Sequence, residues 1–170
     1  NKDKENVWII DPIDGTNNFL HGIPHFAICI ALKTKKEIIS GLIFDPIKDE
    51  MFYAEKDNGA YLNNQRIKVS KKIEINECLF ATGSKVNNEI EVLFRKTGCA
   101  ALDLAYVACG RYDGYFQYNL NLWDIAAGII LINEAGGQIN EIDLSGKKKI
   151  KVTACSSNIA PKLLKILDNF

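Results

Sequence analysis

The sequence has no excess of charge of either sign. Its 170 residues include 21 Lys and Arg residues against 21 Asp and Glu residues. A neutral chain lacks the basic surplus that draws proteins to nucleic acid or to an anionic membrane. We therefore expect no direct nucleic-acid partner, and an anionic ligand would have to be recognised by a local site.

Long hydrophobic runs and paired cysteines are also missing. No apolar run reaches the roughly 18 residues that a membrane span needs, and the charged start, Asn1 to Asn6, lacks the hydrophobic region of a secretion signal. The five cysteines form no CxxC pair and lie in apolar runs, as reduced, buried thiols do. These features predict a cytoplasmic protein without membrane contact and without a disulfide framework.

What the chain does contain is an ordinary globular composition. Apolar residues make up 47% of the sequence and charged residues 25%, enough to bury a sizeable core. There is no internal repeat and no linker-like stretch. We therefore expect residues 1–170 to form a single domain.

Hydrophobic patterns with the strand period and with the helix period alternate along the chain, which favours helices packed on sheets. Four apolar runs near the start, separated by turn residues such as Asp45-Pro46, predict consecutive antiparallel strands. Gly110 and Gly136-Gly137 provide stops for two helices. The predicted strands are 7–10, 26–32, 38–44, 51–54, 78–81, 112–118, 138–142 and 150–154, and the predicted helices are 100–109, 123–135 and 161–170.

Two carboxylates stand three positions apart where the first strand ends, in Asp11-Pro-Ile-Asp-Gly-Thr-Asn-Asn-Phe. If Asp11 and Asp14 converge, they offer the oxygen ligands that Mg²⁺ prefers. The following Gly15-Thr16 amides, where a short helix can begin, suit a phosphate. The residues alone leave a second interpretation open, in which both aspartates merely cap backbone N–H groups of a turn.

Another carboxylate, Asp124, lies in the first turn of the predicted helix 123–135. The helix dipole favours an acidic residue there, so Asp124 could be only a cap. The small residues Ala126, Ala127 and Gly128 instead allow another backbone or a ligand to approach closely. The pattern by itself does not decide between a structural and a metal-binding role.

These segments together resemble the inositol monophosphatase family. The Asp11 motif, Trp123-Asp-Ile-Ala-Ala-Gly and Asn133-Glu-Ala-Gly-Gly are similar to the family's signature motifs, in the same order. Ala100-Ala-Leu-Asp-Leu-Ala-Tyr-Val-Ala resembles the bacterial extragenic-suppressor-type branch. The resemblance covers essentially the whole chain. It implies an α+β fold, the layered αβαβα sugar-phosphatase architecture with mixed, largely antiparallel sheets, here N-terminally truncated without the first helical layer and part of the first sheet.

The resemblance also implies roles for individual residues. Asp11 would bridge two Mg²⁺ ions, the Ile13 carbonyl would bind the first, and Asp14 and Asp124 would complete the second. Gly15 and Thr16 would hold the phosphate by their amides, and the Thr16 hydroxyl would orient or deprotonate the attacking water. The family site implies two or three ions. The remaining substrate contacts would come from Asp14, Gly98, Ala100 and Gln117.

Two departures from the family pattern bear on these expectations. The family usually supplies a further metal ligand from a Glu-Glu motif upstream of the first strand, and this sequence does not include it, so we expect an incomplete first metal site and doubtful activity for this chain alone. Gln117 stands where inositol-type members place a Glu that accepts hydrogen bonds from substrate hydroxyls. An amide keeps one acceptor and loses the charge.

The expected function is Mg²⁺-dependent hydrolysis of inositol monophosphate, or of a related small polyol or sugar phosphate, by metal-activated water. Fructose bisphosphatase and nucleotide 3′-phosphatase activities are alternatives on the same fold. An alternative of another class is a catalytically incomplete binding protein associated with the transcription machinery. The resemblance further implies a homodimer.

Overall fold

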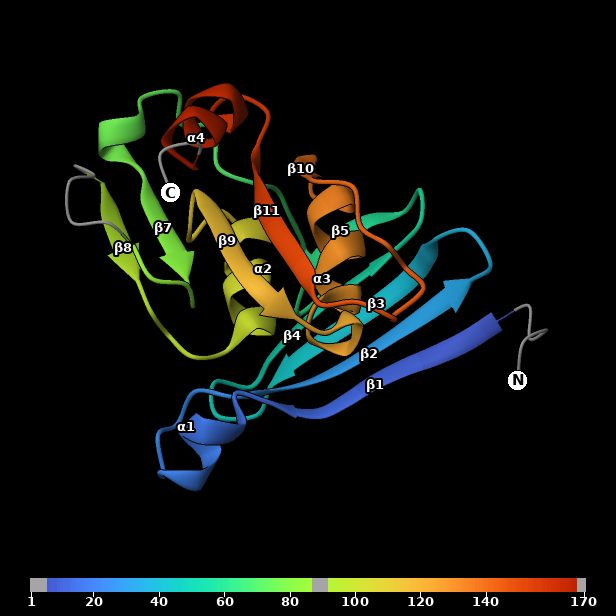
Figure 1. Ribbon diagram of the computed structural model, residues 1–170. Coiled ribbons are helices and arrows are strands. Elements are labelled where there is room, and N and C mark those ends of the chain that lie inside the picture. Colours follow the sequence, from blue (N-terminus) through green and yellow to red (C-terminus); the bar gives the residue numbers. More distant parts are fainter. Residues whose placement is uncertain (1–5, 87–91, 168–170) are drawn as a thin grey trace.

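The computed structural model describes residues 6–86 and 92–167, which form four stacked layers. A six-stranded sheet comes first, two helices cover one of its faces, a five-stranded sheet lies on those helices, and a last helix covers the far side (Figure 1). This order corresponds to the expected αβαβα stack from its second layer onward. Within the described residues, no helix is both long and apolar enough to cross a membrane.

The first sheet is an antiparallel meander in chain order, which confirms the four consecutive strands predicted near the start. It continues into two short strands that the sequence patterns did not reveal, because each is too brief to show alternation. Its strands are β1 (Asn6–Asp14), β2 (Ala27–Thr34), β3 (Ile38–Asp45), β4 (Glu50–Glu55), β5 (Gly59–Leu62) and β6 (Gln65–Ile67).

Two buried helices, α2 (Ala100–Ala108) and α3 (Leu122–Glu134), lie between the sheets, as predicted. Both are apolar on nearly all sides because each contacts a sheet and the other helix. A Cβ at Gly41 of β3 would lie 2.9 Å from the backbone of Ala127. The small residues of α3 therefore serve close packing of the helix on the strand.

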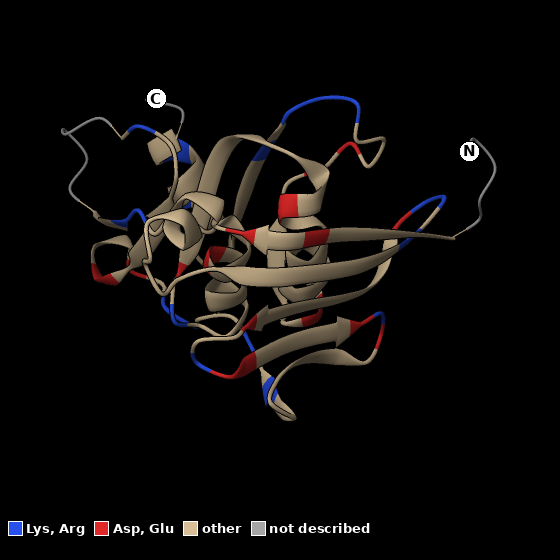
Figure 2. Cartoon of the chain, turned by 90° about the horizontal axis from the view of Figure 1, so that it is seen from below, with Lys and Arg blue, Asp and Glu red and all other residues tan. Residues whose placement is uncertain are grey.

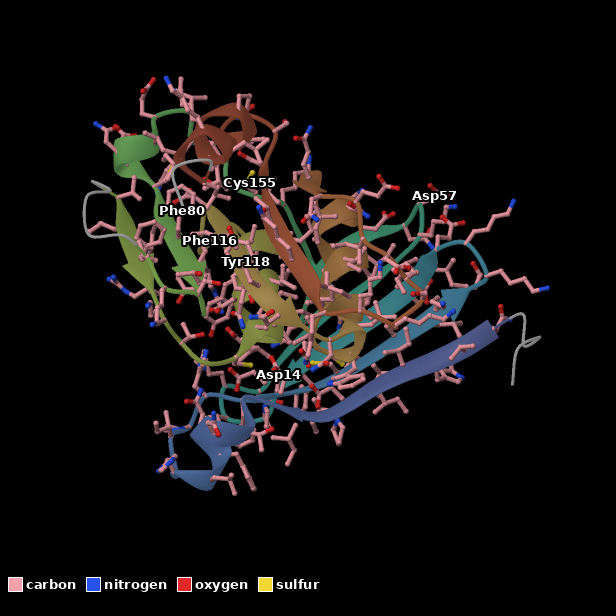
Figure 3. The ribbon with its side chains drawn as sticks, viewed as in Figure 1. Asp14, Asp57, Phe80, Phe116, Tyr118 and Cys155 are labelled. Atoms are coloured by element: carbon pink, nitrogen blue, oxygen red, sulfur yellow. The ribbon has the colours of Figure 1, made fainter. Side chains whose placement is uncertain are left out.

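The second sheet has the strand order β10-β11-β9-β7-β8 and is mixed, since β7 runs parallel to both β8 and β9. Phe80, Phe116 and Cys155 belong to a small core between this sheet and the C-terminal helix (Figure 3). The elements are β7 (Leu79–Thr82), β8 (Leu93–Arg95), β9 (Gly114–Leu120), β10 (Gly137–Ile139), β11 (Ile150–Ser156), α4 (Ala160–Leu167) and the single turn η1 (Ile75–Glu77).

Some predicted boundaries were wrong. The strand expected over 138–142 ends at Ile139. At Asn140 the backbone amide still donates to the Thr153 carbonyl at 3.1 Å, but the Thr153 amide donates to the Asn140 side chain at 2.6 Å in place of its carbonyl, so the regular ladder stops. The C-terminal helix begins at Ala160, and the last three residues of the predicted 161–170 lie outside the described part of the chain. β8 was not predicted.

The outer face of the first sheet is apolar and carries no helix in the described residues. Alternation along β2 buries Ala27, Cys29 and Ala31 against α3 and turns the residues between them outward. Cross-strand partners share a face in an antiparallel pair, so the register assigns the whole outer face. Figure 2 shows this strand surface largely free of charge, with most charged residues at strand ends and loops. Ser40 and Glu55 also lie on this face; its apolar residues are Trp8, Ile10, Ile28, Ile30, Leu32, Leu42, Phe44, Met51, Tyr53 and Tyr61.

Replacing Gly41 with Ala is expected to destabilise the fold by about 1–3 kcal/mol, the usual effect of overpacking a filled core. The added methyl would lie 2.6 Å from Ile130 Cγ2 and 2.9 Å from the Ala127 backbone, so α3 would have to move away from the sheet. Urea unfolding measures the change. Ser40→Ala, on the outward side of the same strand, is the control and should leave stability nearly unchanged; equal effects would contradict the close packing.

Candidate metal centre

The last residues of β1 contain an irregularity that brings two carboxylates together. In a regular strand, residues three positions apart point to opposite faces. The register with β2 shifts between Asp11 and Asp14, as in a β-bulge, and such bulges redirect side chains. The Ile13 amide donates to Asp11 Oδ1 at 3.1 Å and fixes the turn. The carboxylates of Asp11 and Asp14, both on β1, therefore point towards the same region.

Gly15 follows the bulge in the left-handed region, with φ of 85°. A Cβ there would lie 3.1 Å from the His25 carbonyl and 3.2 Å from Cys99 Cβ, so glycine is needed both for conformation and for space. The short helix α1 (Thr16–Leu20) begins immediately afterwards. Its first amides have no partner within the helix, as at every helix start.

Asp14 is held from the other side by the start of α2. The Ala101 amide donates to Asp14 Oδ2 at 2.6 Å, and the Cys99 thiol donates to the same oxygen at 3.1 Å. Figure 3 shows Asp14 near the end of β1, where that strand meets the helical layer. Two donors on Oδ2 fix the orientation of the carboxylate. They leave its other oxygen, Oδ1, available to a ligand.

Asp124 comes from the first turn of α3, where a capping box forms. Asp124 Oδ2 accepts from the Asn121 amide at 2.7 Å and from the Asn121 side chain at 3.2 Å. The capping role that the sequence left open is therefore real. It occupies only one carboxylate oxygen, so it does not compete with ligand binding by the other.

The three carboxylates converge. One ligand oxygen from each of Asp11, Asp14 and Asp124 lies within 4.8 Å of the others. They open into a cavity of about 520 Å³ between β1, α1, β9 and the start of α3. Every residue predicted as a metal, phosphate or substrate contact lines this cavity: Asp11, Ile13, Asp14, Gly15, Thr16, Gly98, Ala100, Gln117 and Asp124.

The electrostatics favour a cation. Burial raises the pKa of Asp14 to about 6, and the nearby Asp124 and Asp11 add to this effect against the lowering by the Ala101 amide. The pKa of Asp11 is also raised, first by burial and also by the charge of Asp124. None of the ion pairs of the described residues involves these three carboxylates. Their mutual repulsion is therefore reduced by hydrogen bonds alone and not by a cationic side chain of the described residues.

The donor set fits a hard divalent ion. All the convergent atoms are oxygens, and in the hydrogen bonds of the described chain Asp11 Oδ2, Asp14 Oδ1 and Asp124 Oδ1 have no donor. Mg²⁺ takes oxygen ligands, and it usually keeps some waters and substrate phosphate oxygens in its shell. Three protein carboxylates at this spacing leave room for both.

Sequence reasoning missed several residues that position the site. Cys99 and the Ala101 amide hold Asp14, and Asn121 holds Asp124. Asn18 ties α1 to the loop that follows it and to a distant segment, by donating to the carbonyls of His25 and Thr97, both at 2.8 Å. These are backbone or single side-chain contacts between separate segments, and only an isolated Cys or Asn marks them in the sequence.

Comparisons with known proteins agree with this geometry. The family model described as "Inositol monophosphatase family" matches residues 1–169. The inositol-1-monophosphatase of Rhizobium meliloti is 42% identical over 156 residues, which cover 82% of this chain and 58% of that relative. The Nus factor SuhB of Haemophilus influenzae is 40% identical over 180 residues, covering 96% of this chain and 67% of the relative. The chain thus spans about three fifths to two thirds of these relatives.

Solved structures show the same architecture. The extragenic suppressor protein suhB from Bartonella henselae superposes with a TM-score of 0.88 at 42% identity, covering 98% of this chain and 74% of that one. An inositol monophosphatase from Anabaena gives a TM-score of 0.88 at 35% identity, covering 99% and 74%. These matches confirm the layered α+β fold that the motifs implied. Because both the family model and the relatives match nearly all of its length, this chain belongs to the inositol monophosphatase family.

Proposed function

We propose that the cavity is the active site of a Mg²⁺-dependent phosphatase that hydrolyses inositol monophosphate or a related small polyol or sugar phosphate. The observation that carries this proposal is the convergence of Asp11, Asp14 and Asp124 within 4.8 Å at the start of α1. Phosphate release from inositol 1-phosphate, measured with and without Mg²⁺, tests it. Absence of Mg²⁺-dependent release from any small phosphate ester would overturn it.

In this proposal Asp11, Asp14 and Asp124 would together hold the two or three Mg²⁺ ions. The Ile13 carbonyl, which accepts from the Thr16 hydroxyl at 3.0 Å, keeps a second lone pair for an ion. Mg²⁺, when bound, would polarise the phosphoryl oxygens, activate water and neutralise charge on the leaving oxygen.

The amides of Gly15 and Thr16 hold the phosphate, because they stand at the start of α1, where backbone N–H groups lack helical partners. Thr16 donates its proton to Ile13, so its oxygen can accept from the attacking water and orient it. The organic part of the substrate lies against Asp14, Gly98, Ala100 and Gln117, which line the rest of the cavity.

Replacing Mg²⁺ with Ca²⁺ is expected to lower turnover at least about tenfold while the ion still binds. Ca²⁺ is larger and accepts irregular coordination, whereas Mg²⁺ demands near-octahedral geometry that fixes the reacting oxygens. Steady-state assays with each ion, together with calorimetric titration of Ca²⁺, measure both properties. Equal rates would mean that ion geometry does not organise the reaction.

A second candidate function is a binding role in the transcription machinery. It is favoured by the relatives whose names are "Nus factor SuhB", including those of Haemophilus influenzae and Pseudomonas aeruginosa. A pull-down against RNA polymerase, run beside the phosphatase assay, separates the two roles.

A cytoplasmic location and a homodimer belong to the proposal as well. The five unpaired cysteines support the cytoplasmic location. Sedimentation of the purified protein tests the homodimer.

A further inference from the structure

A second cavity lies at the opposite end of α3 from the aspartates. Its volume is about 290 Å³, and it shares no lining residue with the metal centre. The helix α3 begins at the metal centre and ends at this cavity, and a helix of 13 residues is about 20 Å long. Figure 1 shows the connection from β11 to α4, which forms one wall, on the side of the molecule away from α1. The cavity is therefore separate from the proposed active site.

Three segments of the chain form this cavity, and hydrogen bonds tie them to one another. The Val69 amide, in the segment after β6, donates to the Ala135 carbonyl at the end of α3 at 3.2 Å. The Asn158 side chain, in the turn after β11, donates to the Lys71 carbonyl at 3.3 Å. Both bonds join residues that are far apart in the sequence. The position of the cavity walls is therefore set by the backbone of the fold.

One hydroxyl group of the cavity wall has no partner. Ser156, the last residue of β11, is 3% exposed, and its Oγ makes no hydrogen bond within the described residues. Such buried, unpaired groups are rare in native proteins and cost stability. Ser70 lines the same cavity, and its Oγ accepts from the Lys72 amide at 3.2 Å, so its proton can be donated. The cavity therefore offers two hydroxyl donors to an acceptor.

Three cationic side chains line the same cavity: Arg66, Lys68 and Lys71. None of them takes part in an ion pair with another described residue. The guanidinium group of Arg66 lies over Gly59, where a Cβ would come within 2.9 Å of Nη2. Unpaired cations beside hydroxyl donors favour a ligand with negative charge over a neutral one.

The negative groups at the cavity are fewer, and the carboxylate among them is already engaged. The two oxygens of Glu134 accept from the backbone amides of Asp57 at 2.9 Å and Gly59 at 2.8 Å. The C-terminal end of α3 adds roughly half a negative charge. Three cations outweigh these groups. The cavity is therefore locally positive, although the net charge of the whole chain is zero.

We infer that this cavity is a second anion site, which binds a phosphate group through the hydroxyls of Ser156 and Ser70 and the cationic side chains of Arg66, Lys68 and Lys71. These donors come from different walls and outnumber the two oxygens of a carboxylate, whereas the tetrahedral oxygens of a phosphate can accept from all the walls at once. The phosphate is either the free ion or the terminal group of a small ester. The inference goes beyond the proposed function, because it involves neither metal ions nor hydrolysis.

Calorimetric titration with inorganic phosphate in the presence of EDTA tests the site, because without divalent ions the three aspartates repel anions. We expect saturable binding at low ionic strength. The same titration with glycerol 3-phosphate separates the two sources of the phosphate group. Binding of the ester shows that the site accepts a terminal phosphate, and binding of inorganic phosphate alone identifies the free ion. Absence of binding by both at millimolar concentration would overturn the inference.

Variants assign the binding to this cavity. Ser156→Ala removes the unpartnered hydroxyl and should weaken phosphate binding about tenfold, the worth of one hydrogen bond to a charged group. The double variant Arg66→Gln, Lys68→Gln should weaken it by at least as much. Its matched control is Lys35→Gln, Lys36→Gln, in the turn between β2 and β3, which should bind like the unsubstituted protein. Weakening in the double variant but not in Ser156→Ala would mean attraction to a positive surface without a defined site, and would overturn the inference.

Thermal unfolding in EDTA gives an independent measurement. A phosphate that binds only the folded chain should raise the Tm of the unsubstituted protein as its concentration increases. The rise should be smaller for Ser156→Ala, although this variant should be at least as stable without phosphate because it lacks the unpaired hydroxyl. An equal rise in both proteins would mean that phosphate acts only as a generally stabilising salt, and would overturn the inference.

Discussion

Replacing Asp124 with Asn is expected to lower kcat by at least about 10²-fold while the protein stays folded. The carboxylate supplies charge to an ion that stabilises the transition state, and an amide of the same shape supplies none. The fold should survive because one amide oxygen can still accept from the Asn121 amide, as Oδ2 does at 2.7 Å. Initial rates and thermal unfolding of the same preparation measure the two effects.

Asp11→Asn should behave in the same way, since Asp11 stands in the same cluster of carboxylates. Asp143→Asn is the matched control: Asp143 is exposed and bonds only to Ser145 in the hydrogen bonds of the described residues. Its activity should match that of the unsubstituted protein. Near-normal activity of Asp124→Asn or Asp11→Asn would remove the metal assignment altogether.

The chain of 170 residues, produced alone, is expected to self-associate through the outer face of its first sheet. Trp8 is 62% exposed and Ile10 56% exposed on the edge strand β1, and their neighbours on β2, β3 and β4 extend the apolar area. Contiguous apolar surfaces of this kind bind one another or a partner. In the described part of the chain β1 is an edge strand, which adds unpaired backbone groups. Sedimentation across a concentration series should show species larger than a dimer.

The double variant Trp8→Lys, Ile10→Lys should shift the distribution towards the monomer or dimer, because two charges then stand on the face. Ile73→Lys is the control, since Ile73 is 59% exposed in the segment before η1, away from the sheet. A monodisperse monomer of the unsubstituted chain at all concentrations would contradict the prediction. An equal response of both variants would mean that the outer face is not the contact.

The helical layer could be predicted well because its signals are local. In α3, isoleucines at helical spacing and the Gly136-Gly137 stop gave a helix over 123–135, and the structure has it over Leu122–Glu134. The longer strands alternate clearly enough to be recognised. The short strands β5, β6 and β8 form because neighbours in space supply the pairing, and three or four residues carry no period of their own.

Only part of the site could be predicted as well. Asp11, Asp14 and Asp124 were identified through motifs, and the structure brings them together. The β-bulge that makes the first two converge could not be read from the sequence, because a bulge depends on the partner strand. The anchors Cys99 and Asn121 were missed for the same reason. Their role exists only once α2 and α3 are placed against β1.

The close contact between α3 and β3 limits which core substitutions the protein can accept during evolution. Protein cores usually tolerate substitutions that keep total volume and pattern. Here the height of α3 above the sheet, set where Gly41 meets Ala127, also sets how far Asp124 stands from Asp11. A displacement of about 1 Å in a reacting group can reduce a rate about 10²-fold. Substitutions at Gly41 and Ala127 are therefore limited by the spacing of the metal ligands as well as by stability. During evolution, a larger residue here would reduce activity before it unfolded the protein.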